Sequence, residues 1–96
     1  ELELAERYLH DVIKYGHNVT AMIELSVALA DGMLSRIDVV QSAYLLQQAK
    51  HFGNDIQQQV IEPLWQSLLM QIDSVIALNP SKEELVSLQQ ARQFLE

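Results

Sequence analysis

The residues from Leu2 to Met33 carry the longest regular hydrophobic pattern in this chain. Mostly apolar side chains recur at alternating steps of three and four residues, at Leu2, Ala5, Leu9, Val12, Gly16, Val19, Ile23, Ser26, Ala30 and Met33. Because an α-helix has about 3.6 residues per turn, this spacing aligns them along one helix of about eight or nine turns. The pattern predicts a long, coiled-coil-like first helix that the rest of the chain covers.

We call this row of aligned residues the seam. Gly16 lies on the seam, and two interpretations of this glycine are open. A glycine inside a helix costs about 1 kcal/mol relative to alanine. It therefore indicates either a close crossing of two helices or a break between two shorter ones, and we favour the crossing because the seam continues in phase on both sides. Asp31-Gly32 is expected to end the helix, with Gly32 in the left-handed conformation that follows a last turn.

The second helix is expected to begin at Ser35-Arg36-Ile37-Asp38, where Ser35 and Asp38 can form a capping box. Since the connection is only about three residues long, the first two helices should lie antiparallel as a hairpin.

From residue 36 to residue 78 the helical pattern persists, with two interruptions. Gly53-Asn54-Asp55 predicts a break, which we place slightly ahead of a bent continuous helix, and Pro63 predicts a kink or a restart. The expected buried series is Leu45, Ala49, Phe52, Ile56, Val60, Leu64, Leu68, Ile72 and Val75. Asn79-Pro80 should end this region.

The last helix should open with the capping box Ser81-Lys82-Glu83-Glu84 and bury Leu85, Leu88, Ala91 and Leu95. The fold class predicted is all-α, an antiparallel bundle of three to four helices with a long first helix followed by a hairpin turn. The 96 residues suffice for one domain, spanning 1–96. Because the chain begins without a methionine and ends inside a helix, we expect a domain excised from a longer protein.

Composition excludes several classes of function. There is no cysteine, which excludes disulfides and thiolate metal sites. The net charge is −7 and the six Lys and Arg residues are scattered, which argues against nucleic-acid binding and against association with an anionic membrane. The longest nearly unbroken apolar run, residues 25–30, is far shorter than the ~20 residues that span a bilayer. With no signal peptide evident, we expect a cytoplasmic location.

The segment from Leu64 to Leu78 is apolar nearly all round, which is typical of a helix that is central in a bundle or covered by a partner. Together with the first helix it offers more apolar surface than one small bundle needs to bury. We therefore expect a non-enzymatic interaction or oligomerisation module of adaptor, chaperone-like or regulatory type, forming a homodimer or holding helices of a second protein. The candidate contacts are Trp65, Leu68, Leu69, Met70 and Ile76.

Tyr8-Leu9-His10-Asp11 supports an alternative. The segment resembles the dimerisation helices of sensor histidine kinases, in which a phosphorylated histidine is commonly followed by an acidic residue on the first helix of a hairpin. The resemblance implies phosphotransfer or dimerisation through His10. It ends at Val12-Ile13-Lys14-Tyr15, which lacks the usual Arg and Pro of that family, and no ATP-binding domain follows.

Two further segments are similar to helices of membrane-bending BAR domains: Glu6-Arg7-Tyr8-Leu9 leading to Ile13-Lys14, and Val60-Ile61-Glu62-Pro63-Leu64. This resemblance implies a lipid-associated scaffold as a third hypothesis, although the net charge has the wrong sign for it. His10 and His17 are seven residues apart, whereas metal ligands on one helix are normally three or four apart. We expect no metal site and no cofactor.

Overall fold

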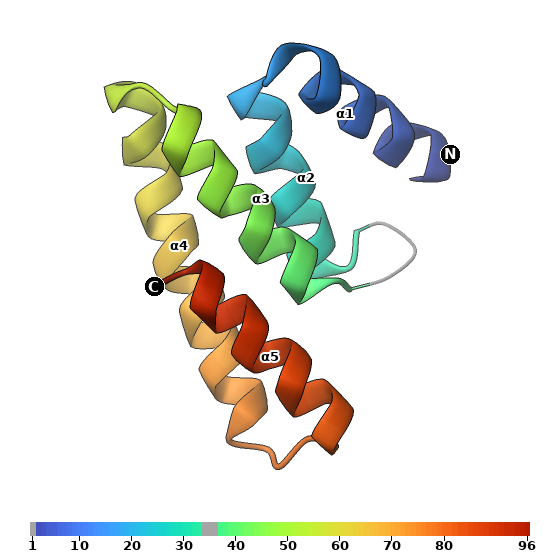
Figure 1. Cartoon of the computed structure of the whole chain (residues 1–96), viewed down its shortest axis with the longest axis vertical. Coiled ribbons are helices and arrows are strands. Elements are labelled where there is room, and N and C mark those ends of the chain that lie inside the picture. The colour runs from blue at the N-terminus through green and yellow to red at the C-terminus, as the bar shows by residue number, and fades with distance from the viewer. Residues whose placement is uncertain (1, 34–36) are drawn as a thin grey trace.

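Five α-helices form the part of the chain that the computed structural model describes, residues 2–33 and 37–96. They are α1 (Leu2–Gly16), α2 (Val19–Asp31), α3 (Val39–Phe52), α4 (Asp55–Ile76) and α5 (Lys82–Phe94). This part of the chain is all-helical, as predicted, but the predicted count of three to four helices is wrong (Figure 1).

α2 and α3 form an antiparallel hairpin, as predicted, although seven residues rather than about three separate the two helices. Next to the connection, the Asp38 N–H donates to the Leu29 carbonyl at 3.0 Å. At the opposite end, the His17 ring stacks on the ring of Phe52 with their centroids 4.8 Å apart. α3 is the central helix of the molecule, because it packs against α4 and α5 as well as α2 (Figure 1).

Two serines occupy the crossing of α2 and α3. Ser26 Oγ donates to the Ser42 carbonyl at 2.8 Å, and Ser42 Oγ donates to the Ser26 carbonyl at 2.7 Å. Both residues are almost completely buried. Their small side chains let the two backbones approach closely, and the reciprocal bonds satisfy both hydroxyls away from water.

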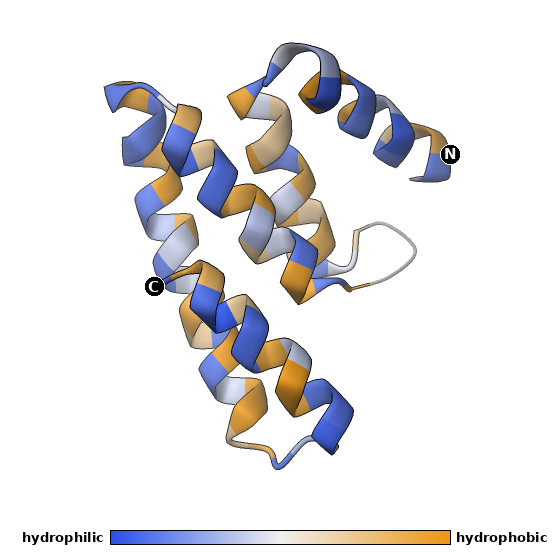
Figure 2. Ribbon diagram, in the orientation of Figure 1, coloured by the Kyte–Doolittle hydropathy of each residue, from blue (hydrophilic) through white to orange (hydrophobic). Residues whose placement is uncertain are grey.

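α4 and α5 form a second hairpin, which packs on α3. The main core gathers side chains from α2 to α5 and from the residue after α5: Val19, Met22, Ala43, Leu46, Ala49, Ile61, Trp65, Leu68, Ile72, Leu88, Ala91 and Leu95. A smaller cluster of Leu25, Leu29 and Leu45 holds α1 through Leu9 and Ile13. Figure 2 shows apolar residues on all five helices, as expected when each contributes one face to a core.

The molecule is flat. Its principal extents are 38 × 32 × 16 Å, and its radius of gyration is 13.2 Å, against about 12.5 Å expected for a chain of this length. Since packed helices lie about 8–10 Å apart, the short axis admits only about two layers. A thin body buries less of each helix than a sphere does, so apolar side chains remain on its surface.

The prediction of one helix from Leu2 to Met33 is wrong, because α1 ends at Gly16 and α2 begins at Val19. His17 adopts a left-handed φ of 47°, and the Asn18 side chain caps α2 by accepting from the Ala21 N–H at 3.0 Å. A Cβ built on Gly16 meets no atom within 4 Å, so no close crossing occurs there. The break that we disfavoured is therefore the correct interpretation.

Gly32 ends α2 with φ 71°, as predicted. The third helix starts at Val39 rather than near Arg36, with Asp38 as its N-cap accepting from the Gln41 N–H at 3.0 Å. The cap predicted at Ser35 falls outside the described residues.

The break at Gly53 is confirmed, and Asn54 with Gln57 forms a capping box that opens α4. α4 then runs continuously through Pro63, so the helix does not restart there. The restart at Asn54 changes which face is buried, and α4 buries Ile61, Trp65, Leu68 and Ile72. Phe52, at the end of α3, and Ile56 and Val60, in the first turns of α4, are exposed, although we expected them to be buried.

The end of α4 and the N-cap of α5 agree with the sequence. α4 stops at Ile76, before Asn79-Pro80, and the Ser81 hydroxyl accepts from the Glu84 N–H at 3.2 Å. Leu88, Ala91 and Leu95 are buried, as expected, whereas Leu85 is only half-buried.

The serine crossing leads to a testable prediction. We expect Ser42→Leu to lower the free energy of unfolding by about 2–3 kcal/mol, because the larger side chain forces the two helices apart. Ser42→Ala should cost only about 1 kcal/mol, since it removes a hydrogen bond without overpacking. Urea unfolding followed by circular dichroism measures both. The exposed control Ser74→Leu should be close to neutral, and a Ser42→Leu variant as stable as that control would contradict the close crossing.

Candidate functional site

Trp65 and Leu68, two of the predicted contact residues, lie inside the molecule. Trp65 is 9 % exposed and Leu68 is 4 % exposed. The Trp65 indole Nε1–H donates to the Leu95 carbonyl at 2.9 Å, and Lys50 Nζ lies 4.5 Å from the centre of the indole ring. Trp65 therefore joins α4 to the end of α5 and is covered by a cation from α3.

The other three predicted contacts do not form one surface with them. Leu69 and Ile76 are half-buried and pack against the main core, whereas Met70 is 70 % exposed. α4 uses the Trp65 and Leu68 face for its own packing, so the structure does not bring the five residues together as an accessible patch.

His10 is half-buried on α1, and the neighbouring Asp11 is exposed. α1 precedes the α2–α3 hairpin and packs chiefly against α2. The hairpin was the architecture that favoured the phosphotransfer hypothesis, and His10 is not on it. The hypothesis stays a prediction without that support.

The segments that resemble BAR domains lie on the separate helices α1 and α4. In the described residues, no helix has the length and apolar character needed to cross a bilayer. Nor do any three His, Asp or Glu side chains of residues 2–33 and 37–96 gather as a group that could hold a metal ion.

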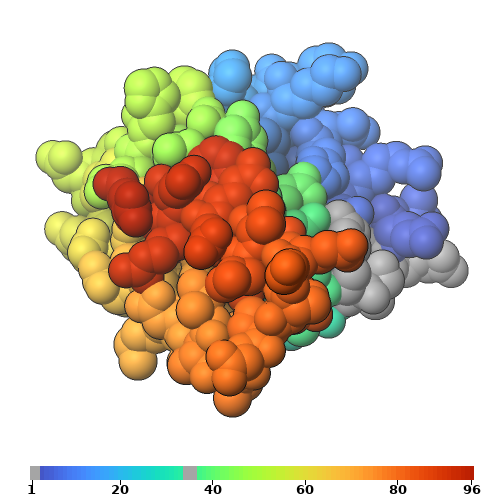
Figure 3. Space-filling model, turned by 60° about the horizontal axis from the view of Figure 1, so that its bottom comes forward, coloured from blue at the N-terminus to red at the C-terminus, as the bar shows by residue number. Residues whose placement is uncertain are grey.

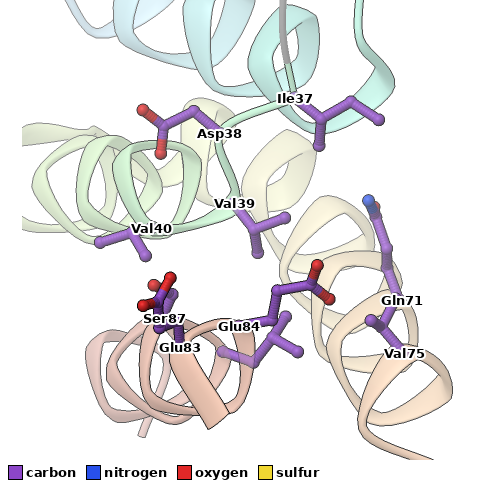
Figure 4. A pocket seen from close by; sticks show the side chains of 10 residues that line it. Ile37, Asp38, Val39, Val40, Gln71, Val75, Glu83, Glu84 and Ser87 are labelled. Carbon is purple, nitrogen blue, oxygen red and sulfur yellow. The ribbon is translucent and has the colours of Figure 1, made fainter. Parts of the chain in front are cut away.

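A groove of about 590 Å³ lies between the start of α3, the second half of α4 and the start of α5 (Figure 4). Its walls are aliphatic, formed by Ile37, Val39, Val40, Val75 and Leu88. Polar side chains stand among and around them, namely Asp38, Gln71, Glu83, Glu84 and Ser87. We call this site the α3–α4–α5 groove.

Local helix-start signals position most of these residues. The Asp38 cap begins α3, so Val39 and Val40 fall in its first turn. The Ser81 cap begins α5, so Glu83 and Glu84 fall in its first turn. The two helix starts meet across the groove, and in Figure 3 the orange surface of α5 borders the green start of α3.

Two hydrogen bonds fix the wall of the groove to the end of α2. The Asp38 N–H donates to the Leu29 carbonyl, and Gln71 Nε2 donates to the Ala30 carbonyl at 3.0 Å. These bonds tie the beginning of α3 and the middle of α4 to one helix end. The groove is thus a preformed feature of the packing.

Most of the apolar wall is accessible to a partner. Val39, Val40 and Val75 are half-buried, and Ile37 is 63 % exposed. Only Leu88, at 6 % exposed, belongs fully to the core. Such a surface can bind apolar side chains by the hydrophobic effect, and its carboxylates can accept hydrogen bonds from cations.

This groove was not predicted from the sequence. The available signals were two β-branched residues after the Asp38 cap and two glutamates after the Ser81 cap, but they are more than forty residues apart. Only the packing of α5 on α3 brings them together. Comparison of the chain with protein-family models, curated proteins and solved structures finds no significant match.

The placement of Trp65 can be tested directly because it is the only tryptophan in the chain. We expect a blue-shifted emission maximum that iodide quenches weakly, and Trp65→Ala should lower the free energy of unfolding by about 3–5 kcal/mol. Met70→Ala, an exposed residue of the same predicted set, should change it by less than about 0.5 kcal/mol. Equal effects of the two substitutions would contradict a buried Trp65.

Proposed function

We propose that this chain is a helical protein–protein interaction domain, without enzymatic activity of its own, whose docking surface is the α3–α4–α5 groove. The observation that carries the proposal is an aliphatic concavity of about 590 Å³ that the fold leaves open. Its volume lies within the range of about 300–1,000 Å³ typical of ligand sites.

The shape and chemistry of the walls favour a helix as the bound element. The walls are faces of three helices that carry aliphatic side chains, which is the surface that amphipathic helices recognise with residues spaced at i, i+3 or i+4, and i+7. Val39 and Val40 contribute branched side chains from the first turn of α3, and Val75 contributes one from α4 (Figure 4). Docked apolar residues would replace the water that now covers these valines.

The proposal keeps the interaction function predicted from the sequence and changes the residues assigned to it. Trp65 and Leu68 support the groove from within the core, and Val39, Val40 and Val75 take their place as contacts. A homodimer through the groove and a complex with a second protein are both forms of this function, and a measured solution mass separates them.

A display selection tests the proposal. The folded domain is immobilised and a library of helical peptides is selected against it. We expect enriched sequences with apolar residues on one helical face. Ser87→Trp should weaken their binding by about tenfold or more, because the exposed Ser87 lines the groove and an indole there occupies the space of a docked side chain.

Gln89→Trp is the matched control, since it adds the same indole to an exposed position of α5 that does not line the groove. Circular dichroism should show both variants folded. No enrichment of amphipathic sequences, or enrichment that Ser87→Trp and Gln89→Trp affect equally, would overturn the assignment of the groove. Analytical ultracentrifugation of the same three proteins would show whether a second copy is the occupant.

A further inference from the structure

Three carboxylates surround the aliphatic walls of the α3–α4–α5 groove. Glu83 and Glu84 extend from the first turn of α5, and Asp38 lies at the start of α3 (Figure 4). Glu83 and Glu84 are exposed, and Asp38 is half-buried while it caps α3. An apolar surface with an acidic border is therefore the chemical character of this site.

The helix dipoles oppose this negative charge but do not cancel it. α3 and α5 both begin at the groove, and each helix start carries the equivalent of about half a positive charge. Glu83 and Glu84 alone carry two full negative charges, against about one positive charge from the two helix starts together. Because the carboxylates outweigh the two dipoles, the groove attracts cations.

Several of the chain's own cations act elsewhere. Lys50 lies over the ring of Trp65, and Lys14 lies 5.5 Å from the centre of the Tyr15 ring on α1. Arg92 pairs with Asp73 across the α4–α5 hairpin. None of these three residues lines the groove.

We propose that the occupant of the groove is a basic amphipathic helix of another protein. Its apolar residues pack against Val39, Val40 and Val75, and Lys or Arg residues beside that stripe face Glu83 and Glu84. The inference rests on the proposed interaction function and adds the charge of the partner.

Charge also argues against a second copy of this chain as the occupant. The net charge is −7, so two copies repel one another, and a symmetric contact through the groove would place the two acidic borders together. A basic partner is drawn to the same border, which raises its rate of association and discriminates against acidic competitors.

Three fluorescein-labelled helical peptides test the inference. They share one apolar face and differ in the flanking positions, which are Lys, Gln or Glu. Fluorescence anisotropy should show the tightest binding for the Lys peptide, then the Gln peptide, then the Glu peptide, with roughly tenfold or more between the first and the last affinity. Each exposed ion pair contributes little to the free energy of binding, but the contributions of several pairs add up. The difference should shrink as salt rises from about 0.05 M to 0.5 M, because salt screens exposed charges.

The double variant Glu83→Gln, Glu84→Gln should bind the three peptides with nearly equal affinity. Glutamine keeps the shape of the side chains and leaves the Ser81 cap in place, so circular dichroism should show an intact fold. The control is Glu24→Gln, Glu62→Gln, which removes two exposed carboxylates outside the groove and the same amount of net charge. The control should retain the preference for the Lys peptide.

The outcomes separate this inference from the proposed function. Equal binding of all three peptides, sensitive to Ser87→Trp, would overturn the basic partner and leave the groove as a docking site. A Lys preference that both double variants reduce equally would also overturn it, since net charge alone would then be responsible. Binding of no peptide, or groove-dependent dimerisation of the chain, would exclude a basic helix as the occupant.

Discussion

The close crossing of α2 and α3 is the contact on which the other helices depend. Ser26 and Ser42 meet there with reciprocal bonds between hydroxyls and backbone carbonyls, and a larger side chain at either position would separate the helices. α3 is held by this contact on one side and presents its remaining faces to α4 and α5. The wholly buried Ala43 and Ala91 show that small residues also occur where α5 packs on α3. Small side chains thus allow the close approach of helices at the centre of the fold.

The groove follows from this arrangement and from the shape of the molecule. A body only 16 Å thick cannot enclose every apolar face of five helices. α5 covers α3 through Leu88, but the first turn of α3 extends past it and leaves Val39 and Val40 half-buried. The Glu83 and Glu84 side chains favour the start of α5 through its dipole and at the same time border this surface. The same two glutamates therefore stabilise the start of α5 and give the border of the groove its negative charge.

Helix boundaries marked by strong local signals could be predicted from the sequence, and tertiary surfaces could not. Gly32, Gly53-Asn54 and Ser81 end or begin helices through local backbone conformation and capping, which depend on a few adjacent residues. We favoured the wrong interpretation of Gly16 because the apolar spacing stays in phase across the break. The periodicity therefore gives no indication of the turn at His17. The contact role given to Trp65 was argued from hydrophobicity, which does not distinguish a core residue from an exposed one. Likewise, the groove joins helix starts that only packing brings together.

Chemical-shift mapping of the ¹⁵N-labelled protein is the most direct test of the claim that the α3–α4–α5 groove is the docking surface. A basic amphipathic helical peptide is titrated into the domain and amide shifts are followed residue by residue. The structure predicts that the largest shifts fall within residues 37–40, 71–75 and 83–88, with α1 unchanged. Shifts concentrated on α1 or around Met70, or no shifts at all, would contradict the account.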